Sequence, residues 1–153
     1  MISQEQFKIL LPMACKWAEE QERIILDNGV SLTAEQIIDA KNAGVCHPEK
    51  IRLLQVSSIP LPENPVLRAA AEETQLITPL TIGMALRYGI FVRSDFWGNR
   101  GIIIHEFVHT SQYEQLGGFQ SFLQKYLYEC VTIGYPEAPM EQEAIITAAK
   151  ICK

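Results

Sequence analysis

Apolar positions recur at three- and four-residue steps over the first part of the chain, with polar positions between them. This period predicts an amphipathic helix over residues 4–27. Asn28-Gly29 then stops the pattern, and Thr33 followed by Gln36 has the spacing of a capping box, which predicts a second helix over residues 34–42. We expect the two helices to form an N-terminal helical pair within residues 1–45.

The middle of the chain has strand-like patterning. Residues 51–59 are rich in β-branched residues and leucine and are closed by Pro60 and Pro62, so they predict a strand. Residues 69–72 predict a short helix. Residues 80–84 and 88–93 predict two further strands with a turn between them.

The helical period returns in the last third of the chain. It predicts a helix over residues 97–113, which Gly117-Gly118 ends, a helix over residues 119–130, and a last helix with Pro139 in its first turn. No internal repeat or interdomain linker interrupts the chain. We therefore expect a single α+β domain over residues 1–153, with about five helices and a small sheet.

Composition narrows the functional classes. A chain of 153 residues with 48% hydrophobic and 20% charged residues is suited to one domain with a real core. Thirteen Lys and Arg against eighteen Asp and Glu leave a net charge of −5 without a basic run, so we expect no nucleic-acid partner.

No membrane or export signal is expected either. The longest apolar stretch, residues 80–92, is interrupted by Arg87 and is too short to cross a bilayer. Residues 1–6 lack a basic region followed by an apolar run, which argues against a signal peptide. The four cysteines never form a CxxC pair. We expect a cytoplasmic protein, and the sequence leaves its oligomeric state open.

One pentapeptide carries chemistry. His105-Glu106-Phe107-Val108-His109 is an HExxH motif inside the predicted helix 97–113. The four-residue spacing places both imidazoles on one helix face, where two neutral nitrogens can bind one ion. Glu106 is then beside the position of a metal-activated water, an arrangement typical of zinc-assisted hydrolysis. The alternative, two histidines hydrogen-bonded in a core, is less favoured because two of only three histidines share this face.

A catalytic zinc site needs a third protein ligand. His47, the remaining histidine, stands in a loop before Pro48, and we expect it to be a turn residue. The other choices are carboxylates that follow the motif. They are Glu114, Glu129, Glu137, Glu141 and Glu143.

Helical phase separates two of these carboxylates. Glu141 and Glu143 differ by about 200° around a helix, so only one of them can face the ion. Ile145, Ala148 and Cys152 continue an apolar row from Glu141, which favours Glu141. Glu143 stays open as the alternative.

The motif, the Gly117-Gly118 break and the distant Glu-x-Glu-Ala at residues 141–144 together resemble small bacterial zincin-like proteins of the gluzincin type. The resemblance covers about residues 50–153 and implies a metallopeptidase-like core. In that family an HExxH metal helix is followed by a glutamate helix, and a mixed sheet with an antiparallel edge strand lines the cleft.

The resemblance also implies roles for individual residues. His105 and His109 match the histidine ligands of Zn²⁺, Glu141 matches the glutamate ligand, and Glu106 matches the general base and acid. The edge strand would correspond to residues 88–93, along which a peptide would lie by strand addition. The chain departs from the family at Ile145, where many gluzincins have an aspartate that supports a histidine, so we expect that support from elsewhere, with Asp95 and Glu129 as substitutes.

A donor to the developing oxyanion is also required. Tyr113, Tyr126 and Tyr135 are candidates. We expect Tyr113 to be core and name Tyr135 as the catalytic candidate, because it lies in the loop before the glutamate helix.

These features predict a zinc metallopeptidase, a hydrolase of peptide or protein substrates in which Glu106 acts on a metal-activated water. The alternative is a non-catalytic zinc-binding or protein-interaction module that retains the zincin fold. An enzyme needs an open coordination position within reach of Glu106, whereas a structural site is closed.

Overall fold

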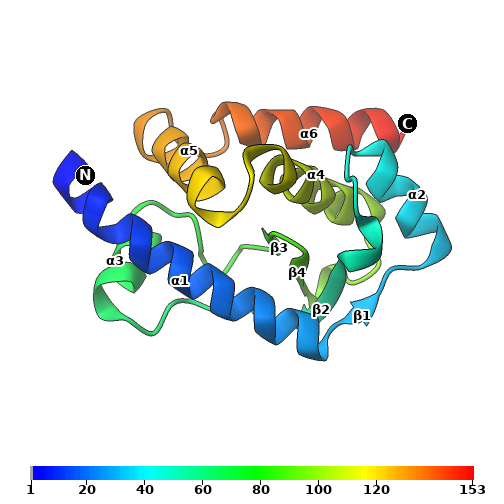
Figure 1. Ribbon diagram of the computed structural model, residues 1–153, viewed down its shortest axis with the longest axis horizontal. Coiled ribbons are helices and arrows are strands. Elements are labelled where there is room, and N and C mark those ends of the chain that lie inside the picture. The colour runs from blue at the N-terminus through cyan, green and yellow to red at the C-terminus, as the bar shows by residue number, and fades with distance from the viewer. Residues whose placement is uncertain (1) are drawn as a thin grey trace.

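The computed structural model describes residues 2–153. Met1, the first residue of the expected domain, lies outside the described residues. Within them the chain forms six α-helices and a mixed sheet of four strands, so the expected α+β class is confirmed (Figure 1). The helices are α1 Gln4–Asn28, α2 Ala34–Asn42, α3 Pro65–Glu73, α4 Arg100–Leu116, α5 Phe119–Thr132 and α6 Pro139–Ile151. The strands are β1 Val30–Ser31, β2 Arg52–Val56, β3 Gly83–Leu86 and β4 Gly89–Arg93, and short 3₁₀ turns cover Pro48–Lys50 and Ser94–Phe96.

Capping groups explain where the helices begin. The capping box of Thr33 and Gln36 is present at the start of α2, as the sequence predicts. The Asn64 side chain accepts from two backbone N–H groups, so α3 begins at Pro65 and is longer than the helix expected over 69–72. The Asn99 side chain accepts from the Ile102 N–H, so α4 begins three residues later than expected.

The strand order of the sheet is β1-β2-β4-β3. β2 pairs with β4 in parallel, while β1 and β3 are antiparallel to their neighbours. The two-residue strand β1 was not expected from the sequence. Residues 88–93 do contain a strand, β4, but the expectation that it forms the edge of the sheet was wrong. β4 occupies an inner position, and β3 forms the edge. The reason is the long-range pairing of Leu53 with Ile90, which covers the other side of β4.

Successive residues of β4 point to opposite faces of the sheet and into two cores. Ile90 and Val92 pack in the core that contains α4 and α6, whereas Phe91 packs in the core that contains α1 and α5. In Figure 1 the sheet accordingly lies between α1 on one side and α4 with α6 on the other. This layering places one helix, α4, between the edge strand and α6.

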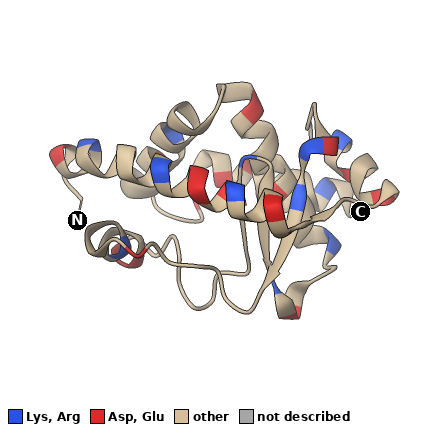
Figure 2. Cartoon of the chain, turned by 60° about the horizontal axis from the view of Figure 1, so that its bottom comes forward, with Lys and Arg blue, Asp and Glu red and all other residues tan. Residues whose placement is uncertain are grey.

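Charge on the outer elements is mixed. Figure 2 shows acidic and basic residues interspersed along α1. Among residues 2–153, no helix combines the length and the apolar character needed to cross a bilayer.

Candidate metal centre

The HExxH motif lies on α4, whose two ends are firmly defined. Asn99 caps its start, and Gly117, in the left-handed conformation with φ of 92°, donates its N–H to the Tyr113 carbonyl at its end. One turn of regular helix between the caps separates His105 from His109, so both rings project from the same face. The fixed backbone therefore sets the separation of the two imidazoles.

The start of α6 is held beside this face. The Met140 N–H donates to the buried Glu129 carboxylate at 2.9 Å, which satisfies one of the unpaired N–H groups of the first helical turn. Glu129 also pairs with Lys125 from its own helix. Glu129 thus stabilises the start of α6. The expectation that it supports a histidine was wrong.

The inward face of α6 differs from the expected one. Glu141, Ala144 and Ala148 are buried, whereas Ile145 is 40% exposed and Cys152 is exposed. Of the expected row, Ala148 is buried, but Ile145 and Cys152 are not, so the row was wrong at two of its three positions. Glu141 nevertheless faces inward and is only 1% exposed, because the small alanines one and two turns along pack against the neighbouring helices.

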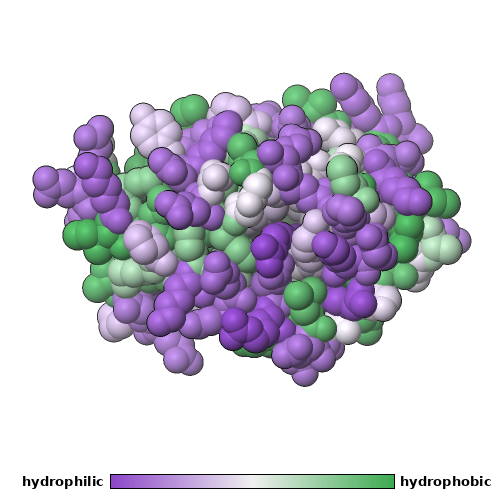
Figure 3. Space-filling view, in the orientation of Figure 1, coloured by the Kyte–Doolittle hydropathy of each residue, from purple (hydrophilic) through white to green (hydrophobic). Residues whose placement is uncertain are grey.

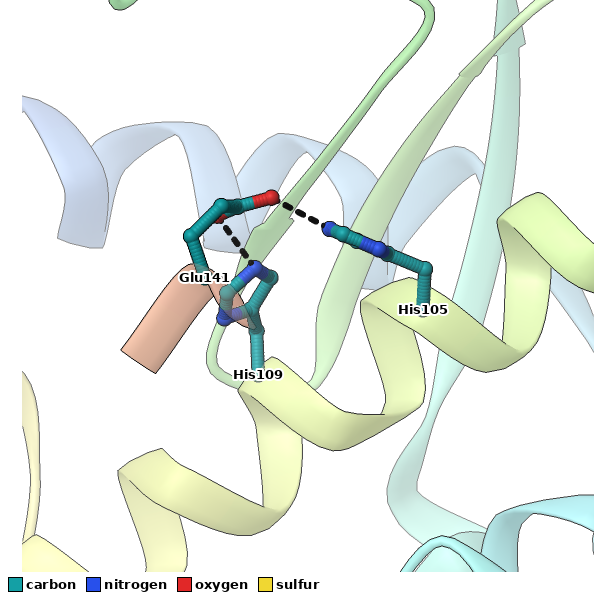
Figure 4. A group of neighbouring side chains, drawn as sticks. All are labelled: His105, His109 and Glu141. Atoms are coloured by element: carbon teal, nitrogen blue, oxygen red, sulfur yellow. Dashed lines mark hydrogen bonds and ion pairs between the residues drawn. The ribbon is translucent and has the colours of Figure 1, made fainter. Parts of the chain in front are cut away.

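Glu141 lies between the two histidines (Figure 4). Its Oε1 is 2.6 Å from His105 Nε2 and its Oε2 is 3.0 Å from His109 Nε2. One potential ligand atom from each of the three residues lies within 4.8 Å of the others. Among residues 2–153, these three side chains form the one group of His, Cys, Asp and Glu that is close enough to hold an ion. Two helices thus bring together the three side chains that the sequence predicts as ligands.

The surroundings shift the protonation of both partners. Burial raises the pKa of Glu141, but hydrogen bonds from His105 and His109 lower it more, so the carboxyl is held in its charged form. Burial lowers the pKa of His109, but its contact with the Glu141 carboxylate and the nearby Glu106 raise it, and the net shift is upward. The carboxylate thus attracts positive charge to this position.

Hydrogen bonds around Gln112 assign the tautomer of His109. The Gln112 Nε2 donates to the Met140 carbonyl at 3.0 Å and to Glu143 Oε1 at 2.8 Å, which uses both amide hydrogens. The Gln112 Oε1, 2.8 Å from His109 Nδ1, therefore accepts the Nδ1 proton. In the neutral ring this leaves the lone pair of Nε2 directed at the Glu141 carboxylate, an unfavourable contact unless a proton or cation lies between them.

This donor set fits a metal ion. A histidine ligand ordinarily donates its second ring N–H to a neighbouring acceptor, which frees the other nitrogen for the metal. Gln112 provides that acceptor for His109, one turn along the same helix, and Glu143 holds Gln112. Sequence reasoning missed this support, although a glutamine three residues after a histidine on one helix was a usable signal. Asp95, named as a substitute, instead pairs with Arg93 on the surface.

Glu106 lies beside the ligands and against the edge strand. It is 6% exposed and accepts a backbone hydrogen bond from Ala85 of β3. A Cβ added to Gly83 would stand 3.2 Å from Glu106 Oε2, so glycine permits this close approach. Burial raises the pKa of Glu106; the adjacent histidines oppose that shift but do not cancel it. A carboxyl with a raised pKa is suited to accepting and returning a proton.

The tyrosine candidates have separate environments. Tyr113 is 1% exposed and stacks on Phe122, so the expected core role is confirmed. The Tyr126 hydroxyl donates to Glu141 Oε2 at 2.9 Å. Tyr135 is 50% exposed and also reaches Glu141. Of the three, Tyr135 combines proximity to the ligands with exposure.

The remaining sequence candidates lie elsewhere. His47 precedes the 3₁₀ turn Pro48–Lys50, is exposed and pairs with Glu49, as expected of a turn residue. Glu114 accepts from the backbone of Cys46 and His47 and from the Tyr88 hydroxyl, and so connects a loop to α4. Glu137 is exposed in the loop before α6.

A cavity of about 540 Å³ opens onto the cluster. His105, Glu106 and Glu141 stand on its wall together with β3, and the rest of the lining is mostly apolar. This volume lies within the range of about 300–1,000 Å³ that ligand pockets occupy. Three potential ligands, a buried carboxyl and an edge strand thus meet at one ligand-sized space.

The chain matches no protein-family model, no curated protein and no solved structure at a significant level. The functional interpretation therefore depends on the residues and their geometry.

Proposed function

We propose that this protein is a zinc-dependent, metallopeptidase-like hydrolase with a zincin-like fold. His105, His109 and Glu141 would hold the metal, and Glu106 would be the general base. The observation that carries the proposal is the convergence of three ligand atoms within 4.8 Å beside a buried carboxyl that contacts an edge strand. Bound zinc would supply the Lewis acidity that polarises a carbonyl and acidifies water.

The protein's own groups would perform the remaining steps. A substrate chain would extend along β3, whose outer side is free of a neighbouring strand. Glu106 would accept a proton from the attacking water and return it to the departing amine. Tyr135 would donate a hydrogen bond to the oxygen that gains charge in the transition state, while Tyr126 orients Glu141.

Two features favour an enzyme over the non-catalytic zinc module. A closed structural site has no need of a buried carboxyl beside the ligands, yet Glu106 stands there with a raised pKa because of burial. A cavity of about 540 Å³ also reaches the proposed ligands. Both features provide what hydrolysis of a bound chain requires.

Metal content tests the first half of the proposal. The purified protein should carry about one zinc per chain, and His105→Ala or His109→Ala should remove most of it. His47→Ala is the matched control because it removes the third histidine from an exposed turn, and it should retain the metal. Unchanged zinc in both motif variants, measured by elemental analysis, would disprove the site.

Hydrolysis of fluorescein-labelled casein tests the second half. Glu106→Gln should retain zinc and reduce the rate by about 10²- to 10⁴-fold, because it removes the proton acceptor. Tyr135→Phe should reduce kcat by at least about tenfold and leave KM nearly unchanged. Zinc bound at full stoichiometry without any zinc-dependent cleavage would favour the non-catalytic module.

A further inference from the structure

The cavity beside the proposed zinc site has an unusual charge distribution. Among its lining residues in the described chain there is no lysine, arginine or aspartate, and the carboxylates are Glu106 and Glu141 alone. Both belong to the proposed site. Away from that end the wall is aliphatic and aromatic, with a few threonines and one glutamine.

The wall is built by elements outside the motif-bearing helices. α1 contributes Leu11, Ala14 and Trp17, and α3 contributes Leu67 and Ala71. Figure 3 shows hydrophobic side chains gathered at the end of the molecule where the first half of α1, α3 and α5 come together. The N-terminal helix is thus part of the binding space, not an addition to a separate core.

The lining limits what can be bound. A peptide terminus carries a full charge, and its recognition in a pocket of low polarity needs a fixed opposite charge. Away from the proposed zinc site the wall offers no cation for a carboxylate, and its two carboxylates are engaged with the histidines and with β3. Uncharged, apolar groups are the chemistry that this wall matches.

The edge strand favours a polypeptide over an acyl chain. The Ile82 carbonyl accepts from Arg93 N–H, so by the alternation of an antiparallel pair Gly83 and Ala85 direct their backbone groups away from β4. Ala85 donates its N–H to Glu106, which is consistent with that direction. An extended peptide can pair with such an edge, whereas a hydrocarbon chain gains nothing from it.

We propose that the substrate is an internal segment of a polypeptide that places a bulky apolar side chain, such as leucine or phenylalanine, in the cavity walled by α1, α3 and α5. This inference rests on the proposed function, since it assigns the substrate class of the same site. It makes the protein an endopeptidase whose selectivity comes from apolar burial and from β3, and not from recognition of a chain end.

Binding can be measured without zinc and without hydrolysis. Trp97→Phe leaves Trp17, on the cavity wall, as the one tryptophan of the chain. Its fluorescence in metal-free protein would be titrated with the capped peptide acetyl-Gly-Gly-Phe-Leu-Gly-Gly-amide and with the same peptide carrying Ser-Asn at the centre. The apolar peptide should bind about tenfold to a hundredfold more tightly. The uncapped apolar peptide should bind no more tightly than the capped one.

Two substitutions on α3 form a matched pair. Ala71→Phe fills the cavity and should weaken binding of the apolar peptide by about tenfold or more, whereas Ala69→Phe, on the exposed side of the same helix, should change it less than about twofold. Ala14→Phe fills the cavity from α1 and provides a second test if Ala71→Phe fails to fold by circular dichroism.

Several outcomes would overturn the inference. They are equal affinity for the apolar and polar peptides, unchanged affinity in both cavity-filling variants, tighter binding of the uncapped peptide by tenfold or more, and binding of decanoate without binding of peptide. Zinc content is measured separately, so retained apolar selectivity with no metal bound would contradict the proposed zinc enzyme and leave the binding inference standing.

Discussion

Glu22 of α1 and Glu141 of α6 are both buried carboxylates, but their charges are balanced in different ways. Glu22 of α1 is 4% exposed and accepts hydrogen bonds from Arg87 Nε at 2.9 Å and Nη2 at 2.8 Å and from the Tyr88 N–H at 3.0 Å. A guanidinium is always charged, so this pair is complete in itself. It joins α1 to the turn between β3 and β4.

Glu141 of α6 is 1% exposed and has no permanent cation beside it. Its partners are two imidazoles and the Tyr126 hydroxyl, and the contact to Gln112 assigns the Nδ1 proton of His109, which in the neutral ring leaves the Nε2 lone pair facing the carboxylate. Glu22 thus illustrates an ion pair that stabilises a fold. Glu141 illustrates a set of donor atoms that can hold a cation, and this contrast is the basis for proposing that its charge is functional and not structural.

The largest expected effect is on metal-dependent stability. Zinc at a thousand times its dissociation constant should raise the free energy of unfolding of the parent protein by about 4 kcal/mol, because only the folded chain assembles the site. Arg87→Met should keep that increment, and His109→Ala should lose it. Urea denaturation with zinc and with a chelator measures it, and loss of the increment in Arg87→Met would contradict the comparison.

Neutralising each carboxylate in metal-free protein should give unequal effects. Glu22→Gln should lower the free energy of unfolding by about 2–4 kcal/mol, since a half-exposed guanidinium loses its buried partner. Glu141→Gln should lower it by less than about 1 kcal/mol, because the new amide can donate to the free nitrogen of His109. Similar losses in urea denaturation would mean that Glu141 is also a structural charge.

The support of His109 should be measurable as zinc affinity. Gln112→Leu removes the acceptor of the Nδ1 proton and should weaken zinc binding by about tenfold to a hundredfold. The control is Gln115→Leu, which removes an exposed glutamine of the same helix that bonds only to Ser111 among the described contacts. Competition with a fluorescent chelator gives both affinities, and equal losses would exclude a specific role for Gln112.

The smallest effect is expected at Glu143. Glu143→Ala should weaken zinc binding less than about fivefold, because Gln112 keeps its bond to the Met140 carbonyl. Glu141→Ala should weaken it by about tenfold to a hundredfold or more, since it removes a ligand. A larger loss for Glu143→Ala in parallel titrations would reverse the assignment of ligand and support.

The sequence by itself predicted the features that depend on neighbouring residues. The start of α2 is determined by the capping box of Thr33 and Gln36. The common face of His105 and His109, with Glu106 beside it, follows from four-residue spacing in a regular helix. Such features require no knowledge of what packs against the helix.

Local patterns were less reliable for the strands and for α6. The pairing of β2 with β4 joins segments far apart in sequence, and this pairing alone makes β3 the edge strand instead of residues 88–93. The rotation of α6 depends on the packing of Ala144 and Ala148 and not on a row through Ile145. Glu141 does lie beside the two histidines, but the stripe that favoured it over Glu143 is partly exposed.

Only the tertiary structure decided how the site is supported and what surrounds it. The chain from His109 through Gln112 to Glu143 crosses between α4 and α6, and the cavity wall is assembled from α1, α3 and α5. These relations join residues whose separation in sequence carries no periodic signal. A helix period determines which residues share a face, but the packing of one element on another determines what that face meets.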